Sequence, residues 1–289
     1  MDRIEWVECP RDAMQGLPWF IPTAQKISYL NTLLQVGFDV LDFGSFVSPK
    51  AIPQLRDTAE VLSGLQLTDT QTKLLAIIAN VRGGETAAEF DEIAYLGFPF
   101  SISETFQQRN TNSSIAQSLD TVETLQEICQ KKKKELVVYI SMAFGNPYGD
   151  VWNTDVALEW TNKIASLGVR TIALADTVGL AKPEDINSIF KALIPALPGV
   201  KFGAHLHADP KNWQAKVTAA WSAGCRRYDS AMKGFGGCPM AEDELVGNLA
   251  TENLKLFLEA NHVKTSIHEN IFQRALIEAN TVFAEPLAT

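Results

Sequence analysis

Residues 136–176 read LVVYISMAFGNPYGDVWNTDVALEWTNKIASLGVRTIALAD, and this stretch decides the fold class. It begins with an apolar, β-branched strand at 136–140 and continues through a loop into a helix at 154–167, whose apolar residues recur at helical spacing. Gly168 ends the helix, and a second apolar strand follows at 171–175. A strand, a helix and another strand in this order are typical of a parallel sheet, in which the helix crosses back over one face.

The same alternation extends along the chain in both directions. We expect further strands at residues 4–7, 38–43, 72–79, 98–102, 200–206 and 227–230. We expect further helices at 23–35 with Thr23 as N-cap, at 86–96, at 114–132, from Pro183 onward, and near 212–223, 242–259 and 267–284. About eight strand–helix units without a break in composition favour one α/β domain over residues 1–289. We predict a (β/α)8 TIM barrel with additional C-terminal helices, with 260–289 as a helical extension, rather than a doubly wound sheet.

The composition sets limits on function. The formal net charge is −9 and the isoelectric point is near 5.0, which argues against a general nucleic-acid binder. No apolar run reaches the length of about 18 residues that a membrane span needs. The four cysteines include no CxxC pair, so they predict free thiols in a reducing compartment rather than a zinc knuckle. We therefore expect a cytoplasmic protein that binds neither nucleic acid nor membrane.

Polar side chains follow the strands of the expected barrel, at the ends where barrel enzymes keep their sites. Each residue alone could be a helix N-cap or an ordinary loop residue, and for Asp176 alone that is the better interpretation. Eight polar residues at successive strand ends indicate a functional site instead. The residues are Asp12, Asp42, Asn80, Glu104, Ser141, Asp176, His205 and His207.

The sequence His205-Leu206-His207 lies at the end of the seventh expected strand. Side chains at positions i and i+2 of a strand point to the same face, so both imidazoles would meet at one point. Together with Asp12, which follows the first strand, they offer two nitrogens and an oxygen to a divalent ion such as Mn²⁺, Zn²⁺, Fe²⁺ or Mg²⁺. The alternative is a pair of surface histidines beyond a strand end.

Two further residues suggest chemistry beside this set. Arg11 precedes Asp12 and could stabilise a developing oxyanion or enolate, or form a salt bridge at the barrel rim. Cys238 lies in the glycine-rich loop GFGGCP at 234–239. It could act as a mobile acid or base, or it could be a buried and inert thiol.

Several segments resemble those of 3-hydroxy-3-methylglutaryl-CoA (HMG-CoA) lyases, which belong to the DRE-TIM metallolyase superfamily. PRDAMQ at 10–15 is similar to the family's PRDGLQ, and SFVSPK at 45–50 matches its SFVSPK. DTVG at 176–179 resembles DTIG, HLH at 205–207 resembles HxH, and GGCP at 236–239 and GNLATE at 247–252 match the family's segments. HxH and RD alone indicate only the superfamily, whereas SFVSPK, GGCP and GNLATE together point to the lyases.

The resemblance implies a reaction, a cofactor and a set of roles. The reaction is retro-Claisen cleavage of HMG-CoA to acetoacetate and acetyl-CoA in a homodimer, in leucine degradation and ketone-body formation. Arg11 would stabilise the enolate, and Cys238 would act from a loop that closes over an acyl-CoA substrate. The implied ligands of Mg²⁺ or Mn²⁺ are Asp12, His205, His207 and Asn248. The implied catalytic residues are Arg11, Cys238, Asp42, Asp176, Glu252 and His205, with His205 or an adjacent carboxylate as the base.

Four positions depart from the family's pattern. Asp42 stands where the family has a glutamate, and Ala208 stands where an aspartate is usual. Asn146 replaces a common cysteine, and Glu8 lies one residue nearer Arg11 than the family's glutamate does. Two other functions therefore stay open. One is a related lyase or aldolase acting on another 3-hydroxyacyl-CoA or a hydroxy-oxo acid, and the other is a non-catalytic barrel that only binds an acyl-CoA.

Overall fold

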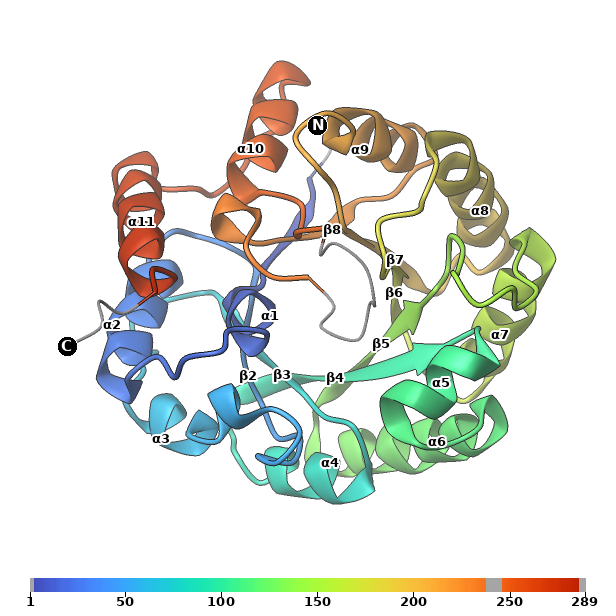
Figure 1. The fold of residues 1–289 in the computed structure, drawn as a ribbon, viewed down its shortest axis with the longest axis horizontal. Helices are drawn as coiled ribbons and strands as arrows, with labels where there is room; N and C mark the ends of the chain where they lie inside the picture. The colour runs from blue at the N-terminus through green and yellow to red at the C-terminus, as the bar shows by residue number, and fades with distance from the viewer. Residues whose placement is uncertain (1–2, 238–245, 286–289) are drawn as a thin grey trace.

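Eight parallel strands close into a barrel in the computed structural model, which describes residues 3–237 and 246–285 (Figure 1). Each strand pairs with the next along the chain, and β8 pairs with β1 to close the ring. The predicted (β/α)8 TIM barrel is confirmed. The strands are β1 Glu5–Glu8, β2 Val40–Ser45, β3 Lys73–Ile77, β4 Ile93–Ser101, β5 Glu135–Ser141, β6 Thr171–Asp176, β7 Lys201–Leu206 and β8 Arg227–Ser230.

Helices surround the barrel on its outside (Figure 1). Their starts follow from local chemistry, since Ser114 forms a capping box with Gln117 and Asn153 accepts a hydrogen bond from the backbone of Val156. Within the described residues, the α-helices α10 and α11 follow the last strand, and α11 packs against α2. The helical elements are α1 Pro10–Gln15, α2 Thr23–Leu34, η1 Pro53–Leu55, α3 Thr58–Ser63, α4 Val81–Ala88, α5 Glu104–Thr111, α6 Ile115–Lys132, α7 Thr154–Ser166, α8 Pro183–Ala196, α9 Trp213–Ser222, η2 Met232–Gly234, α10 Thr251–Ala260 and α11 Glu269–Val282.

Within the described ranges, none of the helices combines the length and the apolar character that a bilayer crossing requires.

The strands divide the apolar residues into two clusters. On β5, Val137 and Tyr139 belong to the smaller cluster, whereas Val138 and Ile140 belong to the larger one. Because successive side chains of a strand point to opposite faces, this alternation separates the barrel interior from the layer beneath the helices. The interior cluster comprises Val7, Cys9, Val40, Leu75, Tyr95, Val137, Tyr139 and Ala173.

The helix predicted at 86–96 is wrong beyond Ala88, and the helix itself begins earlier than predicted, at Val81. α4 ends at Ala88, and the chain enters β4 at Ile93. β4 has apolar residues on both faces, which suits a strand covered on both sides better than an amphipathic helix. Gly97 does not end a helix but lies within β4, where an added Cβ would come 3.2 Å from the ring of Tyr139.

Two other helix starts also differ from the predictions. Thr23 is the first residue of α2 rather than its N-cap, because its hydroxyl donates to Asp57 and Pro22 takes the cap position. The helix predicted at 242–259 begins at Thr251 within the described residues. The preceding segment is extended because its backbone pairs with the end of β7, where Leu249 N donates to Leu206 O. The sequence also left α1, α3 and α5 unpredicted.

Candidate active site at the barrel mouth

The site begins with α1, which lies at one mouth of the barrel directly after β1 (Figure 1). Pro10 is the first residue of α1, a position that suits proline because the N–H it lacks would have no helical partner there. The next two residues, Arg11 and Asp12, are both buried. The short helix thus places a cation and a carboxylate over the carboxyl ends of the strands, where barrel sites lie.

Asp12, His205 and His207 converge at this mouth. One carboxylate oxygen and one nitrogen from each ring lie within 4.8 Å of one another. His205 belongs to β7 and His207 follows it directly, so the two rings share one face as the i, i+2 spacing predicted. The neighbouring β8 lies between β7 and β1 in the ring, which brings Asp12 to the same point.

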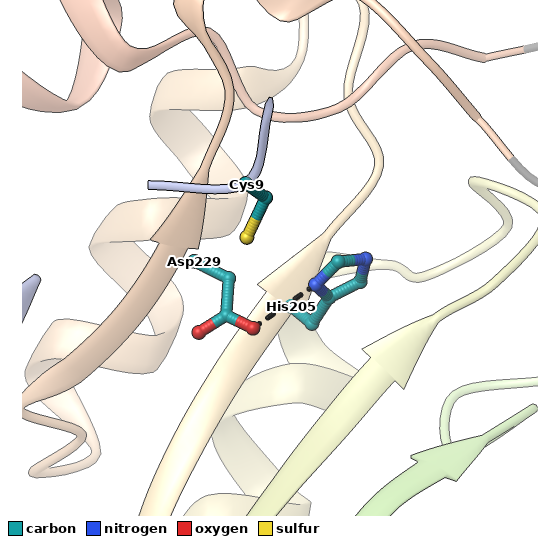
Figure 2. Close-up of side chains that lie close together, drawn as sticks. All are labelled: Cys9, His205 and Asp229. Carbon is teal, nitrogen blue, oxygen red and sulfur yellow. Dashed lines mark hydrogen bonds and ion pairs between the residues drawn. The ribbon is translucent and has the colours of Figure 1, made fainter. Parts of the chain in front are cut away.

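His205 has one ring nitrogen engaged away from this point. Nδ1 of His205 lies 3.1 Å from Oδ2 of Asp229, and its second ring nitrogen lies on the far side of the ring (Figure 2). A metal-binding histidine commonly holds its other nitrogen in this way, because the bond fixes the tautomer and the ring orientation. The backbone of Thr177 acts on the ring of His207 and raises its pKa against the effect of burial. The residues therefore fit a divalent cation, with the second ring nitrogen of His205 left for it.

The charges at the mouth support the same use. Burial opposes the charge of Asp12, but Arg11 and the two histidines lower the pKa of this carboxyl overall. Burial, followed by His205, lowers the pKa of His207 to about 4, so this ring is neutral at neutral pH and its lone pair is free. Burial also disfavours charge on His205, yet the hydrogen bond to Asp229 raises its pKa overall.

Asn248 joins the site from the segment that crosses the barrel mouth. Its Nδ2 donates to Oδ2 of Asp12 at 2.7 Å and to the carbonyl of Phe235 at 2.9 Å. Gly236 makes this approach possible, because an added Cβ there would lie 2.7 Å from Asn248 Nδ2 and 2.9 Å from Asp12 O, and its φ is +97°. The backbone of Gly236 thus packs directly onto two of the predicted ligands.

Arg11 is held from three sides. Its Nε and Nη2 donate to the carboxylate of Asp42, with Nη2 at 2.6 Å, and its Nη1 donates to Asp12 at 2.9 Å and to Gln15 at 2.8 Å. Burial opposes its charge, but Asp42 and Asp12 raise the pKa of Arg11 overall. Burial raises the pKa of Asp42 to about 6 against the lowering effect of Arg11. The guanidinium is thus a fixed cation beside the histidine cluster.

Asp176 lies at the end of β6 and is paired with a residue that the sequence analysis missed. Nζ of Lys216, from α9, donates to Asp176 Oδ2 at 2.6 Å and to the carbonyls of His207 and Gly179 at 2.8 and 3.0 Å. Both side chains of the ion pair are 2% exposed. Lys216 therefore ties the segment after β6 to the end of β7, next to the histidine cluster.

Glu8 is a second buried group whose partners only the structure reveals. Its two carboxylate oxygens accept from Met232 N at 2.8 Å and from the hydroxyl of Thr251 at 2.6 Å. Burial raises the pKa of Glu8 to about 8. The end of β1 is thereby bonded to both sides of the segment that carries the glycine-rich loop and Asn248.

The remaining predicted residues lie outside this cluster or outside the described residues. Glu252 accepts a hydrogen bond from Lys233 N at the start of α10, and Ser141 is the last residue of β5. Asn80 caps α4, and Glu104 accepts from Ile115 N, so for these two the ordinary structural interpretation holds. Cys238 lies outside the described residues.

Asn146 has a structural explanation for its departure from the family pattern. Its side-chain oxygen accepts from the backbone of Tyr148 and Asp150, and its Nδ2 donates to the carbonyl of Asp150. This arrangement closes the loop after β5 on itself, as asparagine commonly does in turns. Asn146 therefore shapes the loop and does not join the histidine cluster.

A (β/α)8 barrel with a carboxylate, two imidazoles and a fixed guanidinium at its mouth defines a class of metal-using barrel enzymes. Comparison with known proteins narrows this class. The family model described as HMGL-like matches residues 3–278, and the chain belongs to this family.

Named relatives and solved structures agree with the family. The chain is 31% identical to a hydroxymethylglutaryl-CoA lyase of Bacillus subtilis, over 89% of this chain and 85% of the relative. It is 32% identical to a 3-hydroxy-3-isohexenylglutaryl-CoA/hydroxymethylglutaryl-CoA lyase of Pseudomonas aeruginosa, over 93% and 88%. An HMG-CoA lyase structure from Acinetobacter baumannii, in complex with coenzyme A and 3-methylmalate, matches with a TM-score of 0.89 and 30% identity, over 98% of this chain and 92% of that one.

Proposed function

We propose that this protein is a divalent-metal-dependent carbon–carbon lyase that cleaves HMG-CoA to acetoacetate and acetyl-CoA. The observation that carries the proposal is the position of Arg11, whose guanidinium is bonded to Asp12 of the histidine cluster and held by Asp42. A retro-Claisen cleavage needs a Lewis acid that binds the substrate oxygens and a positive charge that stabilises the developing enolate. The proposed cation site and the guanidinium of Arg11 lie side by side at one mouth of the barrel.

We assign the cation site to Asp12, His205, His207 and Asn248. A donor set of carboxylate, amide and imidazole suits Mg²⁺ or Mn²⁺. When bound, a divalent cation would polarise the substrate oxygens and favour loss of the proton from the tertiary hydroxyl. Support comes from the spacing of the three ligand atoms within 4.8 Å and from the contact of His205 Nδ1 with Asp229.

Asp42 is the residue we assign to proton removal. His205 has Nδ1 bonded to Asp229, so a ring that also serves as a ligand has no nitrogen left to accept a proton. The pKa of Asp42, raised to about 6 by burial, suits proton transfer near neutral pH. Loss of the hydroxyl proton and cleavage of the adjacent carbon–carbon bond give acetoacetate and the enolate of acetyl-CoA.

Arg11 would stabilise that enolate, because its orientation is fixed before the charge develops. The enolate then takes one proton to become acetyl-CoA, and we assign this proton to Cys238, the residue to which the family resemblance points. Asp176 and Glu252 act in the proposal as supports, Asp176 through its pair with Lys216 and Glu252 through its hydrogen bond with Lys233.

We also propose the domain organisation and the compartment from the sequence pattern, and the oligomer from the family resemblance. We expect a single domain over residues 1–289, with residues 260–289 as a helical extension, that forms a homodimer in the cytoplasm. Helix α11, which lies within that range, supports the extension. Light scattering of the purified protein measures the oligomer directly.

The test is turnover of HMG-CoA by purified protein, with chelator-stripped enzyme and enzyme supplied with Mg²⁺ or Mn²⁺. We expect acetyl-CoA and acetoacetate in equal amounts, only when the cation is supplied. Cleavage of other 3-hydroxyacyl-CoA compounds in place of HMG-CoA would show a related lyase. Binding of acyl-CoA without cleavage of any of them would show a non-catalytic barrel and would contradict the proposal.

A further inference from the structure

Asp229 is a buried carboxylate beneath the histidine cluster that the family motifs quoted above do not include. It lies on β8 directly opposite His205 of β7 in the strand register. One of its oxygens lies 3.1 Å from Nδ1 of His205, and the other accepts from Nη1 of Arg227 at 2.8 Å. The side chain of Asp229 is 1% exposed, so both contacts are shielded from water.

Arg227 holds this carboxylate from the opposite side. Its side chain is 1% exposed, its Nε donates to Glu5 at 3.1 Å, and its guanidinium lies over the ring of Tyr139. Gly203 leaves the room for it, since an added Cβ at Gly203 would lie 2.6 Å from Nη1 of Arg227. The result is a continuous chain of contacts through the barrel interior from Glu5 to His205.

Both carboxylate oxygens of Asp229 have partners, so the orientation of this side chain is fixed. Arg227 is buried and packs on Tyr139, whose ring also meets the ring of His205 edge-on at a centroid distance of 5.8 Å. Asp229 therefore presents one oxygen to Nδ1 in a set direction. A carboxylate in this place favours the tautomer that carries the proton on Nδ1, which leaves Nε2 unprotonated.

We propose that Asp229 is a positioning residue that holds His205 with its Nδ1 protonated and its Nε2 directed to the cation site. This inference rests on the proposed function, because it concerns the same cation site. Asp229 does not touch the substrate in this proposal, and it acts only through the ring of His205.

Asp229 and His205 also belong to a second candidate metal site, but the geometry argues against a metal ion there. Atoms of Cys9, His205 and Asp229 also lie within 4.8 Å of one another, so they form a candidate metal cluster of their own (Figure 2). However, the guanidinium of Arg227 is already bonded to Asp229, and a divalent cation there would meet a fixed positive charge. Burial also raises the pKa of the Cys9 thiol, so this group stays protonated and is a poor ligand. We therefore assign the contact to positioning.

Asp229→Asn tests the proposal, because it keeps the size of the side chain and removes the charge. Metal-stripped protein is titrated with Mn²⁺, and the free ion is counted by its electron paramagnetic resonance signal. We expect the Kd for Mn²⁺ to rise by about 10- to 100-fold, the usual effect of removing a partner of a metal-binding histidine. A Kd within about twofold of the wild type would overturn the proposal, since that is smaller than any such effect.

Asp57→Asn is the matched control. Asp57 pairs with buried Lys26 at 2.7 Å between the outer helices, and it has no contact with the histidine cluster. The substitution removes a carboxylate from a buried ion pair in the same way, so it measures the effect of lost stability alone. We expect its Kd for Mn²⁺ to match that of the wild type. An equal loss of affinity in both variants would reduce Asp229 to a structural role and overturn the proposal.

The tautomer can be read in the wild-type protein if Asp229→Asn does not fold. The chain has four histidines, so the imidazole ¹⁵N resonances of the Mg²⁺-loaded protein can be assigned one by one. We expect His205 to carry its proton on Nδ1, and a proton on Nε2 would contradict the proposal. Wild-type protein that binds Mn²⁺ but does not cleave HMG-CoA would refute the proposed lyase activity alone, and would leave the role of Asp229 intact.

Discussion

Nδ2 of Asn248 lies 2.7 Å from Oδ2 of Asp12, although 236 positions of the sequence separate the two residues. The contact exists because the segment before α10 crosses the barrel mouth and pairs with the ends of β7 and β8. The amide of Asn248 carries Oδ1 beside Nδ2, so half a turn about its last bond would present an oxygen to the same point. Asn248 can therefore contribute an oxygen to the same cation site as Asp12.

Asn248→Ala should weaken cation binding without unfolding the barrel. The variant removes the amide beside Asp12, and we expect the Kd for Mn²⁺ to rise by about tenfold or more. Equilibrium titration with detection of free Mn²⁺ measures the change. Asn261→Ala is the control, because Asn261 only bonds its own helix end at the carbonyl of Phe257. An unchanged Kd in Asn248→Ala would exclude Asn248 from the site.

Arg11→Gln should abolish most turnover while the cation still binds. The side chain is proposed to stabilise the enolate, and removal of one such donor commonly lowers kcat by about 100- to 1,000-fold. Arg3→Gln serves as the control, because Arg3 is an exposed residue that pairs with Asp39 outside the mouth. Steady-state turnover and Mn²⁺ titration are measured on the same preparations. If cation binding is lost together with turnover, the role of Arg11 is structural.

Glu8 should make the stability of the protein depend on pH. Its pKa is raised from 4.5 to about 8 in the folded state, so between these values the folded protein holds a proton that the unfolded chain releases. The free energy of unfolding therefore falls as the pH rises from about 5 to about 8, and it changes no further above that range. The size is a few kcal/mol, at about 1.4 kcal/mol for each pKa unit.

Glu8→Gln should remove this slope, because the amide cannot ionise. Urea unfolding between pH 5 and pH 8.5 compares it with wild type, and the variant should gain stability relative to wild type as the pH rises. Glu92→Gln, at an exposed position, should keep the wild-type slope. Parallel pH profiles for wild type and Glu8→Gln would show that Glu8 is already ionised in the folded protein.

Lys216→Met should destabilise the barrel strongly. It leaves the buried carboxylate of Asp176 without its partner, and breaking a buried ion pair in this way costs about 3–5 kcal/mol. The double variant Lys216→Met/Asp176→Asn should recover part of the loss, since no buried charge is left unpaired. Lys163→Met breaks an exposed pair with Glu159 and should cost about 1 kcal/mol or less. Urea unfolding that ranks the three variants otherwise would contradict the assigned contacts.

The barrel could be predicted because its signals are local. Short apolar strands, helical spacing and glycine stops recur along the chain, and their order alone favours the parallel ring. The error at residues 86–96 arose where a strand is covered on both faces, since its continuous apolar run reads equally well as a helix. The prediction of Thr23 as an N-cap failed for a different reason. Its hydroxyl donates to Asp57, which lies on a distant segment of the sequence.

The candidate site could be predicted only in part. The spacing of His205 and His207 and the position of Asp12 at a strand end were readable, whereas Asn248 came from the family resemblance. Asp229 and Lys216 were missed because their partners depend on strand register and on how α9 packs. One signal for Asp229 was present, since Arg227 and Asp229 place two charges at i and i+2 on a strand that must be buried in a barrel.

Anomalous diffraction tests the cation site most directly. Crystals of the wild-type protein soaked in a manganese salt and measured at the manganese absorption edge locate the ion without reference to activity. We expect one strong peak bounded by Asp12, His207 and Nε2 of His205. A peak on the Nδ1 side of His205, between Cys9 and Asp229, or a mouth without any peak would contradict the assignment.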